Sequence, residues 1–472
     1  MTGRRVVVVG GGLAGITAAI ALRDAGAEVT LLESRPRLGG AATSYARAGM
    51  MVDNGQHVFL RCCTSYAGLL ARLGVTDSVA IQDRFDVTVL SPDGPARLRR
   101  SSLPSPLHLA KALASYPLLS LAERARVGRA ALAFRFADPT SRALDGQRLG
   151  DWLAARGQGE RARRRLWDLF IISALNIGGD EASTALAAKV IKTALLGRRD
   201  AADIGMASVP LGRLHADATA ALLGRLGAQI RLGARATAVE RQAGGDFSVR
   251  IGRGERADAD TEDMSDAADS EAVPADGVVL AVPPGQAARL AATAGVEDTA
   301  WPRLGQSPIV NVHVIYDQQV TDLPFAAAVD SPVQWVFDKT RQAGLGTGQY
   351  LAVSVSAADD LVDVPTAEIR ELFVPALQRL FPAAANALIT DFFVTRERRA
   401  TFRQGPGCGA LRPGAGTPVP GLVLAGAWTA TGWPDTMEGA VRSGHIAARE
   451  LISGLASLPT ADLQLDSAWT GA

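Results

Sequence analysis

The apolar residues at the start of the chain change their spacing twice and predict a strand, a helix and a second strand. Val6 to Val9 is an unbroken β-branched run, which is typical of a buried parallel strand. Leu13 to Ala25 is rich in small residues and has helical spacing. Val29 to Glu33 completes a βαβ unit, which indicates an α/β fold with a parallel sheet.

Later segments repeat this alternation at larger scale. Leucine and alanine recur at steps of three and four over residues 103–136 and 161–196, which predicts helical blocks. Strands return at Val278–Val282 and Ile309–Tyr316. Residues 254–276 are acidic and nearly free of large apolar groups, so burial cannot repay the entropy of ordering them. We expect a mobile surface loop there, with a partner-binding segment as the alternative.

Size and composition narrow the class of protein. A chain of 472 residues is too long for one ordinary core and predicts two domains, and 47% hydrophobic with 21% charged residues is typical of a soluble globular protein. The net charge of +1 gives no strong field for nucleic acid or an anionic membrane. The three cysteines, Cys62, Cys63 and Cys408, lack metal-ligand spacing, so we expect a reducing cytoplasmic compartment and no metal site.

Glycines follow the first strand in the pattern G-x-G-x-x-G, at Gly10, Gly12 and Gly15. They allow a tight turn, close backbone approach to a pyrophosphate, and close packing of helix on strand. Free N–H groups at the start of the helix, at Leu13 and Ala14, then face the phosphates. Glu33 ends the second strand, where a carboxylate accepts ribose hydroxyls. This context predicts a dinucleotide site.

Two further motifs favour FAD over NAD as that dinucleotide. ESRPRLGGAATS brings cations and a second close backbone approach near the pyrophosphate, through Arg35, Arg37, Gly39 and Gly40. Near the other chain end, a strand leads through Gly426 and a loop to a small-residue helix that begins at Met437, Glu438 and Gly439. Its N-terminus is suited to the flavin's pyrimidine edge, where negative charge gathers on reduction.

These motifs resemble the FAD-dependent amine oxidase and phytoene desaturase superfamily. Residues 211–242 are similar to its middle segment, with Val239 on the strand whose backbone meets adenine. The resemblance implies a glutathione-reductase-like Rossmann-type domain assembled from residues 1–85, 205–300 and 414–456. An α+β substrate domain would comprise residues 86–204 and 301–413, and residues 457–472 would form a C-terminal tail.

Several stretches resemble one branch of that superfamily, the hydroxysqualene dehydroxylases. They are VDNGQHVFL, LWDLFIISALNIGGDEAS, SPIVNVHVIYD, SPVQWVFDKT and WTATGWPDTMEGAVRSG. The resemblance implies that an allylic C30 alcohol, hydroxysqualene, loses water and receives a hydride to give squalene in hopanoid biosynthesis. It also implies an electron donor, which stays unidentified. The expected substrate contacts are Trp167, Asn176, Trp335 and Phe337.

Such a reaction needs an acid near the leaving hydroxyl and a dry cavity. Asp53, Asn54, Gln56 and His57 form a polar cluster beside Gly55, just before an apolar pair. We take His57 as the first choice of acid and Asp53 as the second. Alternatively, the cluster, including Gly55 and Gln56, only braces the flavin by hydrogen bonds.

One residue departs from the superfamily pattern. An acidic residue usually follows the glycine of the C-terminal motif and bonds the flavin's ribityl chain, whereas this chain has Ala427. The lost hydrogen bond is worth about 0.5 to 1.5 kcal/mol, which weakens FAD binding without excluding it.

Residues 103–136 and 167–175 offer an apolar lining for the cavity, opposite Trp335 and Phe337. A C30 hydrocarbon must be collected from a bilayer. We therefore expect peripheral contact with the inner face of the plasma membrane through an exposed part of residues 103–136.

Three other functions stay open. A flavin amine oxidase commonly uses a lysine and an aromatic cage, which four lysines and five tyrosines disfavour. A carotenoid desaturase also takes a long polyprenoid, and the flavin motifs alone do not separate it from a dehydroxylase. A prenyl-binding carrier on the same fold needs no flavin, and Ala427 is the one feature in its favour.

Overall fold

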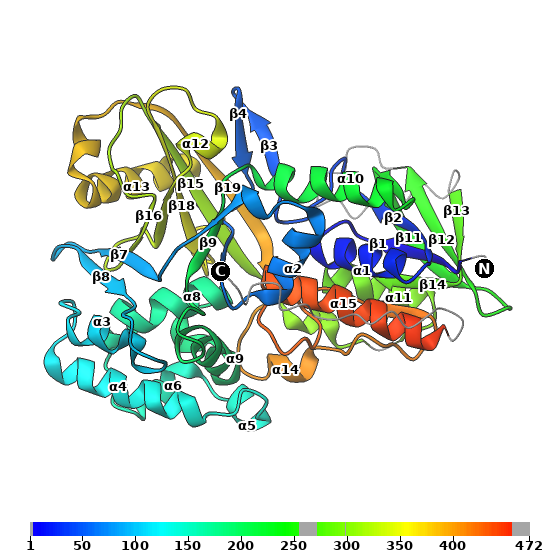
Figure 1. Cartoon of the computed structure of the whole chain (residues 1–472), viewed down its shortest axis with the longest axis horizontal. Coiled ribbons are helices and arrows are strands. Elements are labelled where there is room, and N and C mark those ends of the chain that lie inside the picture. Colours follow the sequence, from blue (N-terminus) through cyan, green and yellow to red (C-terminus); the bar gives the residue numbers. More distant parts are fainter. Residues whose placement is uncertain (1–2, 254–270, 298, 456–472) are drawn as a thin grey trace.

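The computed structural model describes residues 3–253, 271–297 and 299–455. Figure 1 shows three regions: a parallel sheet with its helices at the right, a second sheet at the upper left, and a helical lobe at the lower left. No helix within these ranges is both long and apolar enough to cross a membrane.

The parallel sheet is built from both ends and the middle of the chain. Its strand order is β10–β2–β1–β14–β20. The bounds are β1 Arg5–Val9, β2 Glu28–Glu33, β10 Gln229–Leu232, β14 Gly277–Leu280 and β20 Leu422–Leu424, and every neighbouring pair is parallel. The predicted α/β class is confirmed, and the first strands and helix agree with the pattern of apolar residues. The predicted domain boundaries stay a prediction.

Each face of this sheet packs against a different set of helices or strands. Val6 and Val8 join the core of α1 (Leu13–Asp24) and α15 (Met437–Gly454). Val7 and Val9 join the core beneath an antiparallel meander of β11 (Ala234–Arg241), β12 (Phe247–Arg253) and β13 (Glu271–Ala275). Alternate residues thus bury both faces, as the unbroken valine run predicts.

The second sheet has seven strands in the order β19–β15–β18–β17–β16–β7–β8. The bounds are β7 Asp86–Leu90, β8 Ala96–Arg99, β15 Ser307–Tyr316, β16 Phe325–Ala328, β17 Trp335–Asp338, β18 Gln349–Ser356 and β19 Ile389–Thr401. Helix α13 (Thr366–Leu380) packs its Ile369 and Phe373 against one face. Strand β15, between β19 and β18, is long and almost wholly buried.

The helical lobe comprises α3 (Ala110–Ala114), α4 (Leu121–Phe136), α5 (Arg142–Asp145), α6 (Leu149–Ala154), α8 (Asp168–Leu175) and α9 (Thr184–Val190). Phe134 lies at its centre, with its ring centroid 4.2 Å from that of Trp152 and 5.5 Å from that of Trp167. Burial of such aromatic side chains stabilises the lobe.

Each of the two predicted helical blocks contains several helices, which local chemistry separates. Pro117 falls in the gap before α4, and Ser120 starts α4 with a capping box to Glu123. Asn176 ends α8 in the left-handed conformation at φ +49°. The expected acidic loop also needs correction, because residues 271–275 form β13. Residues 254–270 and the predicted tail at 457–472 lie outside the described residues.

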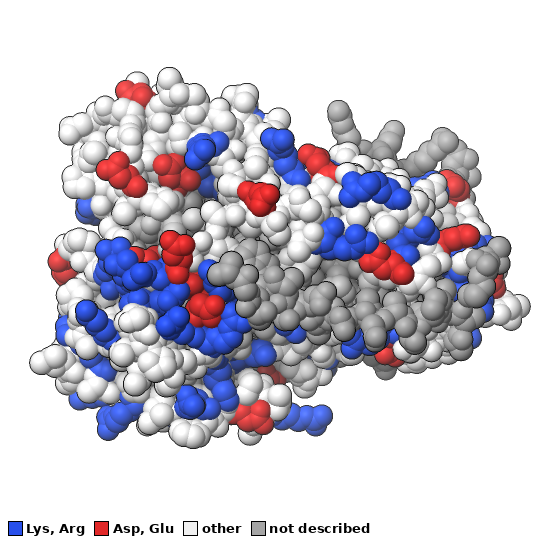
Figure 2. Space-filling view, in the orientation of Figure 1, with Lys and Arg blue, Asp and Glu red and all other residues white. Residues whose placement is uncertain are grey.

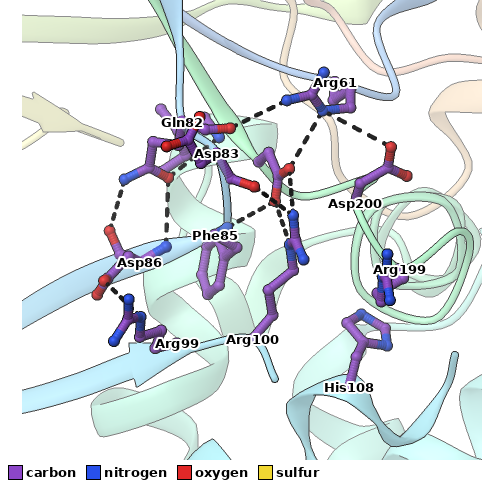
Figure 3. Close-up of polar contacts among 12 residues, drawn as sticks. Arg61, Gln82, Asp83, Phe85, Asp86, Arg99, Arg100, His108, Arg199 and Asp200 are labelled. Atoms are coloured by element: carbon purple, nitrogen blue, oxygen red, sulfur yellow. Dashed lines mark hydrogen bonds and ion pairs between the residues drawn. The ribbon is translucent and has the colours of Figure 1, made fainter. Parts of the chain in front are cut away.

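A buried carboxylate fastens the helical lobe to the rest of the molecule. After β6 (Val79–Ile81) the chain adds β7 and β8 to the second sheet and then enters the lobe. It returns to β9 (Ile204–Ala207), which pairs with β6 and with β5 (Val58–Leu60). Asp203, which is fully buried, accepts Nε of Arg100 at 2.7 Å, Nη2 of Arg100 at 2.9 Å and the N–H of Phe85 at 2.6 Å. Arg61 adds a bond to it at 3.3 Å (Figure 3). The segment that enters the lobe and the segment that leaves it are therefore held together by charged hydrogen bonds.

Candidate active site

The glycines after β1 form a backbone cradle at the carboxyl end of the parallel sheet. Gly10 has φ +109°, and a Cβ atom there would lie 2.3 Å from the Ala281 carbonyl oxygen. At Gly15 a Cβ atom would lie 1.9 Å from the Gly10 carbonyl oxygen. The N–H of Gly39 donates to the Gly11 carbonyl at 2.9 Å, so the second glycine pair lies against the first loop. Only glycine fits such contacts.

Several predicted cofactor residues converge on this cradle. Leu13 and Ala14 begin α1 there, and Gly12 pairs with Gly39 through an isolated bridge. Gly40, at φ +60°, is close enough that its Cβ atom would lie 3.0 Å from the Gly12 Cα atom. An anion at this place would meet free N–H groups at a helix N-terminus.

Glu33 closes the cradle at the end of β2. Its carboxylate accepts the N–H of Gly11 at 2.7 Å and of Arg35 at 2.8 Å, and the side chain is buried. These bonds fix the carboxylate beside the glycine turn, where its remaining lone pairs can accept hydroxyl groups. Arg35 and Arg37 have exposed side chains.

The backbone of Val239 is already hydrogen-bonded within the protein. Its N–H donates to the Thr293 hydroxyl at 2.8 Å, and that hydroxyl donates back to the Val239 carbonyl at 3.1 Å. An adenine contact at this backbone would require Thr293 to give up these bonds. The role of Val239 stays a prediction.

The C-terminal motif approaches the cradle from the other chain end. Gly426 donates its N–H to the Ser443 hydroxyl at 2.8 Å and has φ +144°, where its Cβ atom would lie 2.3 Å from Nε1 of Trp428. Helix α15 crosses α1 at Gly444, where a Cβ atom would lie 2.4 Å from the Ala14 carbonyl. Close packing of these helices therefore depends on glycine.

The Glu438 side chain bonds a neighbouring helix and does not cap α15. Thr436, not Glu438, caps α15, by accepting the N–H of Gly439 at 3.2 Å. The Glu438 carboxylate accepts the N–H groups of Ser65 at 3.2 Å and Tyr66 at 2.8 Å, in the first turn of α2 (Thr64–Leu73). Nε of Arg442 also donates to it at 2.7 Å. Three donors therefore hold this side chain as the cap of a neighbouring helix, and its contact with the cofactor stays a prediction. Met437 and Gly439 keep their place in the first turn of α15.

Ala427 lies in a loop that a buried arginine supports. Arg412 donates from Nη2 to the carbonyl oxygens of Ala427 at 2.9 Å and Thr429 at 2.5 Å. Nearby, burial raises the pKa of Asp435 to about 6. Arg412 was not among the site residues predicted from the sequence, because its partners are backbone carbonyl groups, which every residue has.

Asp53 is fully occupied by hydrogen-bond donors. Its Oδ1 accepts the Ser44 hydroxyl at 2.7 Å and the N–H of Leu211 at 3.0 Å. Its Oδ2 accepts Nε2 of Gln342 at 2.9 Å and lies 3.1 Å from Nζ of Lys339. The four donors occupy both oxygens, so the carboxylate is directed at the protein rather than at a ligand. The geometry therefore supports Asp53 as a brace rather than as the acid.

His57 lies beside Gly55, within the same turn. A Cβ atom on Gly55 would lie 3.4 Å from Nε2 of His57, so the glycine leaves space against the ring. Burial lowers the pKa of His57 below its ordinary value of 6.5; the Asp53 charge opposes this shift and that of Lys339 adds to it. The ring is therefore mostly neutral at pH 7.

Asn311 on β15 meets this turn from the opposite sheet and was not among the predicted site residues. It is fully buried, and its Nδ2 donates to the Asn54 carbonyl at 3.3 Å. Its Oδ1 and the Nε2 of Gln56 are buried without a hydrogen-bond partner among the described residues. Unpaired buried polar atoms are costly, which makes these two side chains candidates for contact with a ligand. The polar residue inside the apolar run SPIVNVHVIYD was the signal in the sequence.

The predicted substrate residues separate into two pairs. Trp335 and Phe337 lie on β17, facing the helical lobe, with Trp335 Nε1 donating to the Ser173 hydroxyl of α8 at 2.7 Å. Trp167 is instead buried in the lobe's core and bonds Gln158 at 3.0 Å. Asn176 is buried too, and its amide bonds Ser307, Thr401 and the N–H of Ala357. Trp167 and Asn176 thus have structural partners in place of the predicted substrate.

The expected cavity lining also needs correction. The inner face of α4, at Val127, Ala130 and Phe134, packs in the core of the helical lobe. Leu121, Leu132 and Phe136 are exposed at its surface instead. Apolar residues at helical spacing cannot by themselves show whether they line a cavity, a core or a surface.

Comparison with known proteins shows the family to which this chain belongs. The family model for flavin containing amine oxidoreductase matches residues 13–452. The chain belongs to this family. It is therefore an oxidoreductase of a flavoprotein family, and a carrier without enzymatic activity is not retained.

Named relatives support the narrower resemblance. A hydroxysqualene dehydroxylase of Rhodopseudomonas palustris is 30% identical, over 94% of this chain and 97% of its own length. A hydroxysqualene dehydroxylase of Sinorhizobium fredii is 28% identical, over 94% and 97%. A zeta-carotene desaturase of Zea mays is 25% identical, over 93% and 82%. The resemblance predicted from the motifs is confirmed.

Solved structures of the family show the same fold. A putrescine oxidase superposes with a TM-score of 0.69 at 21% identity, covering 95% of this chain and 99% of that one. Cyclohexylamine oxidase from Brevibacterium oxydans gives 0.68 at 21% identity, covering 96% and 100%. At such identity the likeness concerns the fold alone.

The residues present fit a flavin dinucleotide. The glycine cradle and the first turn of α1 suit a pyrophosphate, and the Glu33 carboxylate lies beside them. The unpaired Oδ1 of Asn311 and Nε2 of Gln56 suit a ligand with both a donor and an acceptor.

Proposed function

We propose that the chain is an FAD-dependent hydroxysqualene dehydroxylase, which removes the hydroxyl of hydroxysqualene to give squalene in hopanoid biosynthesis. The identity to hydroxysqualene dehydroxylases over almost the whole of both chains carries the proposal. The polar niche formed by His57, Gln56 and Asn311 beside Gly55 supports it, because an allylic hydroxyl needs both a donor and an acceptor.

Bound FAD would supply the hydride, held through Gly10, Gly12, Gly15, Gly39 and Gly40 at its phosphates and Glu33 at its ribose. In overall balance, one hydride and one proton convert the alcohol to the alkene and water. The electron donor that reduces the flavin stays unidentified.

This chain's residues then have separate roles. His57 donates the proton to the leaving hydroxyl, and Asn311 and Gln56 orient that hydroxyl. Asp53 and Lys339 form a buried ion pair that fixes the turn. Trp335, which is half-buried on β17, offers apolar surface to the hydrocarbon, and the buried Phe337 stacks beside it with ring centroids 6.3 Å apart. A dry site favours survival of the allylic cation until hydride arrives.

The lysines do not favour amine oxidation. Lys339 is paired with Asp53, Lys189 lies over the Trp433 ring, and Lys192 donates to the Ala137 carbonyl. A carotenoid desaturase stays the second candidate, because zeta-carotene desaturases are among the relatives at 24–27% identity.

The substrate requires access to a bilayer, so we also propose a cytoplasmic protein in reversible contact with the inner face of the plasma membrane. The exposed apolar residues between Leu103 and Phe136 support this part of the proposal.

Anaerobic incubation with hydroxysqualene and chemically reduced FAD, followed by mass spectrometry, tests the proposed reaction. We expect squalene, with one solvent-derived proton in the water released. Absence of squalene, with oxidation of a carotene by the FAD-loaded protein, would instead establish the desaturase.

A further inference from the structure

We propose that α4 docks the protein on a bilayer of anionic lipids, through an outward apolar stripe bordered by arginines. The inference rests on the proposed function only in assuming a lipid-borne substrate. It adds the docking element and the charge of the lipid, neither of which follows from the reaction.

Helix α4 has two apolar faces. One is buried and contains Val127, Ala130 and Phe134. The opposite face exposes Leu121 by 77%, Leu132 by 56% and Phe136 by 79%. Leu121, Ala125, Gly128, Leu132 and Phe136 follow one another at steps of three or four residues, so they form a single stripe. A core helix needs only one apolar face, so the second requires another explanation.

Exposure of large apolar side chains is concentrated around this helix. Within the described residues, Leu103 and Leu107 are also exposed, and they lie on the segment that leads into α3, which packs against α4. Clustered exposed apolar groups mark interaction surfaces, whereas isolated ones do not.

The net charge of the helical lobe indicates what binds the apolar stripe, namely a surface of anionic lipids. Residues 101–204 contain 16 Lys or Arg and 10 Asp or Glu, a net +6, although the whole chain carries only +1. The rest of the chain is therefore acidic by −5. The near-neutral total predicted no attraction to anionic membranes, and the separation of charge overturns that expectation. Figure 2 shows the basic side chains gathered on the lower-left lobe.

Arginines border the apolar stripe itself. Arg129 and Arg135 are exposed on α4 and make no hydrogen bond or ion pair among the described residues. They flank the stripe on the same helix, so lipid phosphates and the apolar interior of the bilayer would be engaged together.

Co-sedimentation with vesicles tests the docking without any turnover. The full-length protein is mixed with vesicles of phosphatidylcholine alone, or of phosphatidylcholine with phosphatidylglycerol. We expect binding to the mixed vesicles, with less binding at high salt because screening weakens the attraction. Equal binding to both vesicle types, or none to either, would overturn the proposal.

Two sets of variants separate the stripe from the arginines. Leu121→Ser with Leu132→Ser and Phe136→Ser should lower binding at least tenfold on both vesicle types. Arg129→Gln with Arg135→Gln should lower it on anionic vesicles by about fivefold per charge. Leu372→Ser with Leu388→Ser, and Arg341→Gln with Arg379→Gln, make the same changes at exposed sites of the second sheet's region and should leave binding unchanged.

Other occupants give distinct results. If the stripe joins two copies of the chain, sedimentation velocity will show a dimer that the serine variant dissociates, and the docking proposal fails. If the protein binds anionic vesicles through α4 but forms no squalene from detergent-dispersed hydroxysqualene, the proposed reaction fails and the docking stands.

Discussion

The parallel-sheet region and the helical lobe use opposite means to form their functional surfaces. The sheet region is defined by backbone: Gly10, Gly15 and Gly39 stand where any side chain would collide or strain the chain. The lobe is defined by which face of a helix is left uncovered, as on α4. A glycine requirement is visible in the sequence, whereas the exposure of a leucine depends on what packs beside it.

The strongest test of a backbone-defined site is to add one methyl group. Gly15→Ala would place Cβ 1.9 Å from the Gly10 carbonyl oxygen. We expect loss of bound flavin, measured by absorbance of the purified protein, because the turn must move. Gly68→Ala is the matched control: nothing lies within 4 Å of a Cβ atom there, and it should stabilise α2 by about 0.5 to 1 kcal/mol. Normal flavin content in Gly15→Ala would contradict the cradle.

Substitutions of His57, in the turn beside Gly55, test whether side chains or the backbone carry the chemistry. His57→Gln and His57→Ala should keep the flavin and lower turnover by about 10² to 10⁴-fold, the usual contribution of a positioned proton donor. Activity of the unaltered enzyme should rise as pH falls through the lowered pKa of His57, because the protonated ring is the donor. Loss of flavin in both variants would show that His57 only braces the ring.

The attachment of the lobe depends on one buried carboxylate. Asp203→Asn should cost about 3 to 5 kcal/mol of unfolding free energy, because Arg61 and Arg100 lose their charged partner. Urea unfolding measures this. Asp24→Asn breaks an ion pair with Arg72 that is largely exposed to solvent, and should cost at most about 1 kcal/mol. Equal costs for the two variants would refute the central role of Asp203.

Buried histidines make the parallel-sheet region, through His215, and the second sheet, through His313, sensitive to acid. Burial lowers the pKa of His215 to about 4 and that of His313 to about 3. The unfolded chain therefore binds more protons below pH 6.5, and stability should fall as pH drops from 6.5 toward 4, by about 1.4 kcal/mol per pH unit for each histidine. His215→Gln should reduce that slope, whatever its offset in stability. An unchanged slope would exclude His215 as a source.

The smallest expected effect concerns the departure from the family pattern. Ala427→Asp should tighten FAD binding about two- to tenfold, equivalent to one hydrogen bond of about 0.5 to 1.5 kcal/mol. Ala427→Asn controls for charge. Titration of the apoprotein with FAD measures both, and weaker binding in both would mean that the loop held by Arg412 has no room for the longer side chain.

The sequence was informative where local chemistry is decisive. β1, α1 and β2 end within about two residues of their predicted bounds, since valine runs and glycine turns have few alternatives. The helical blocks were less readable, because Ser120 and Asn176 end helices that apolar spacing alone continues. Trp167 and Asn176 were expected to contact substrate because their segment resembles the substrate helix of the family, whereas their partners Gln158 and Ser307 are set by the packing of the fold.

By itself, the sequence determined the βαβ unit, the glycine cradle, the flavoprotein family and the polar turn around Gly55, since each depends on residues adjacent along the chain. Only the tertiary structure decided that Asn311 meets that turn, that Asp53 is saturated by donors, that Glu438 caps α2, and that α4 keeps an uncovered apolar stripe. These features join residues tens to hundreds of positions apart. Their energies come from burial and pairing, which no local pattern specifies.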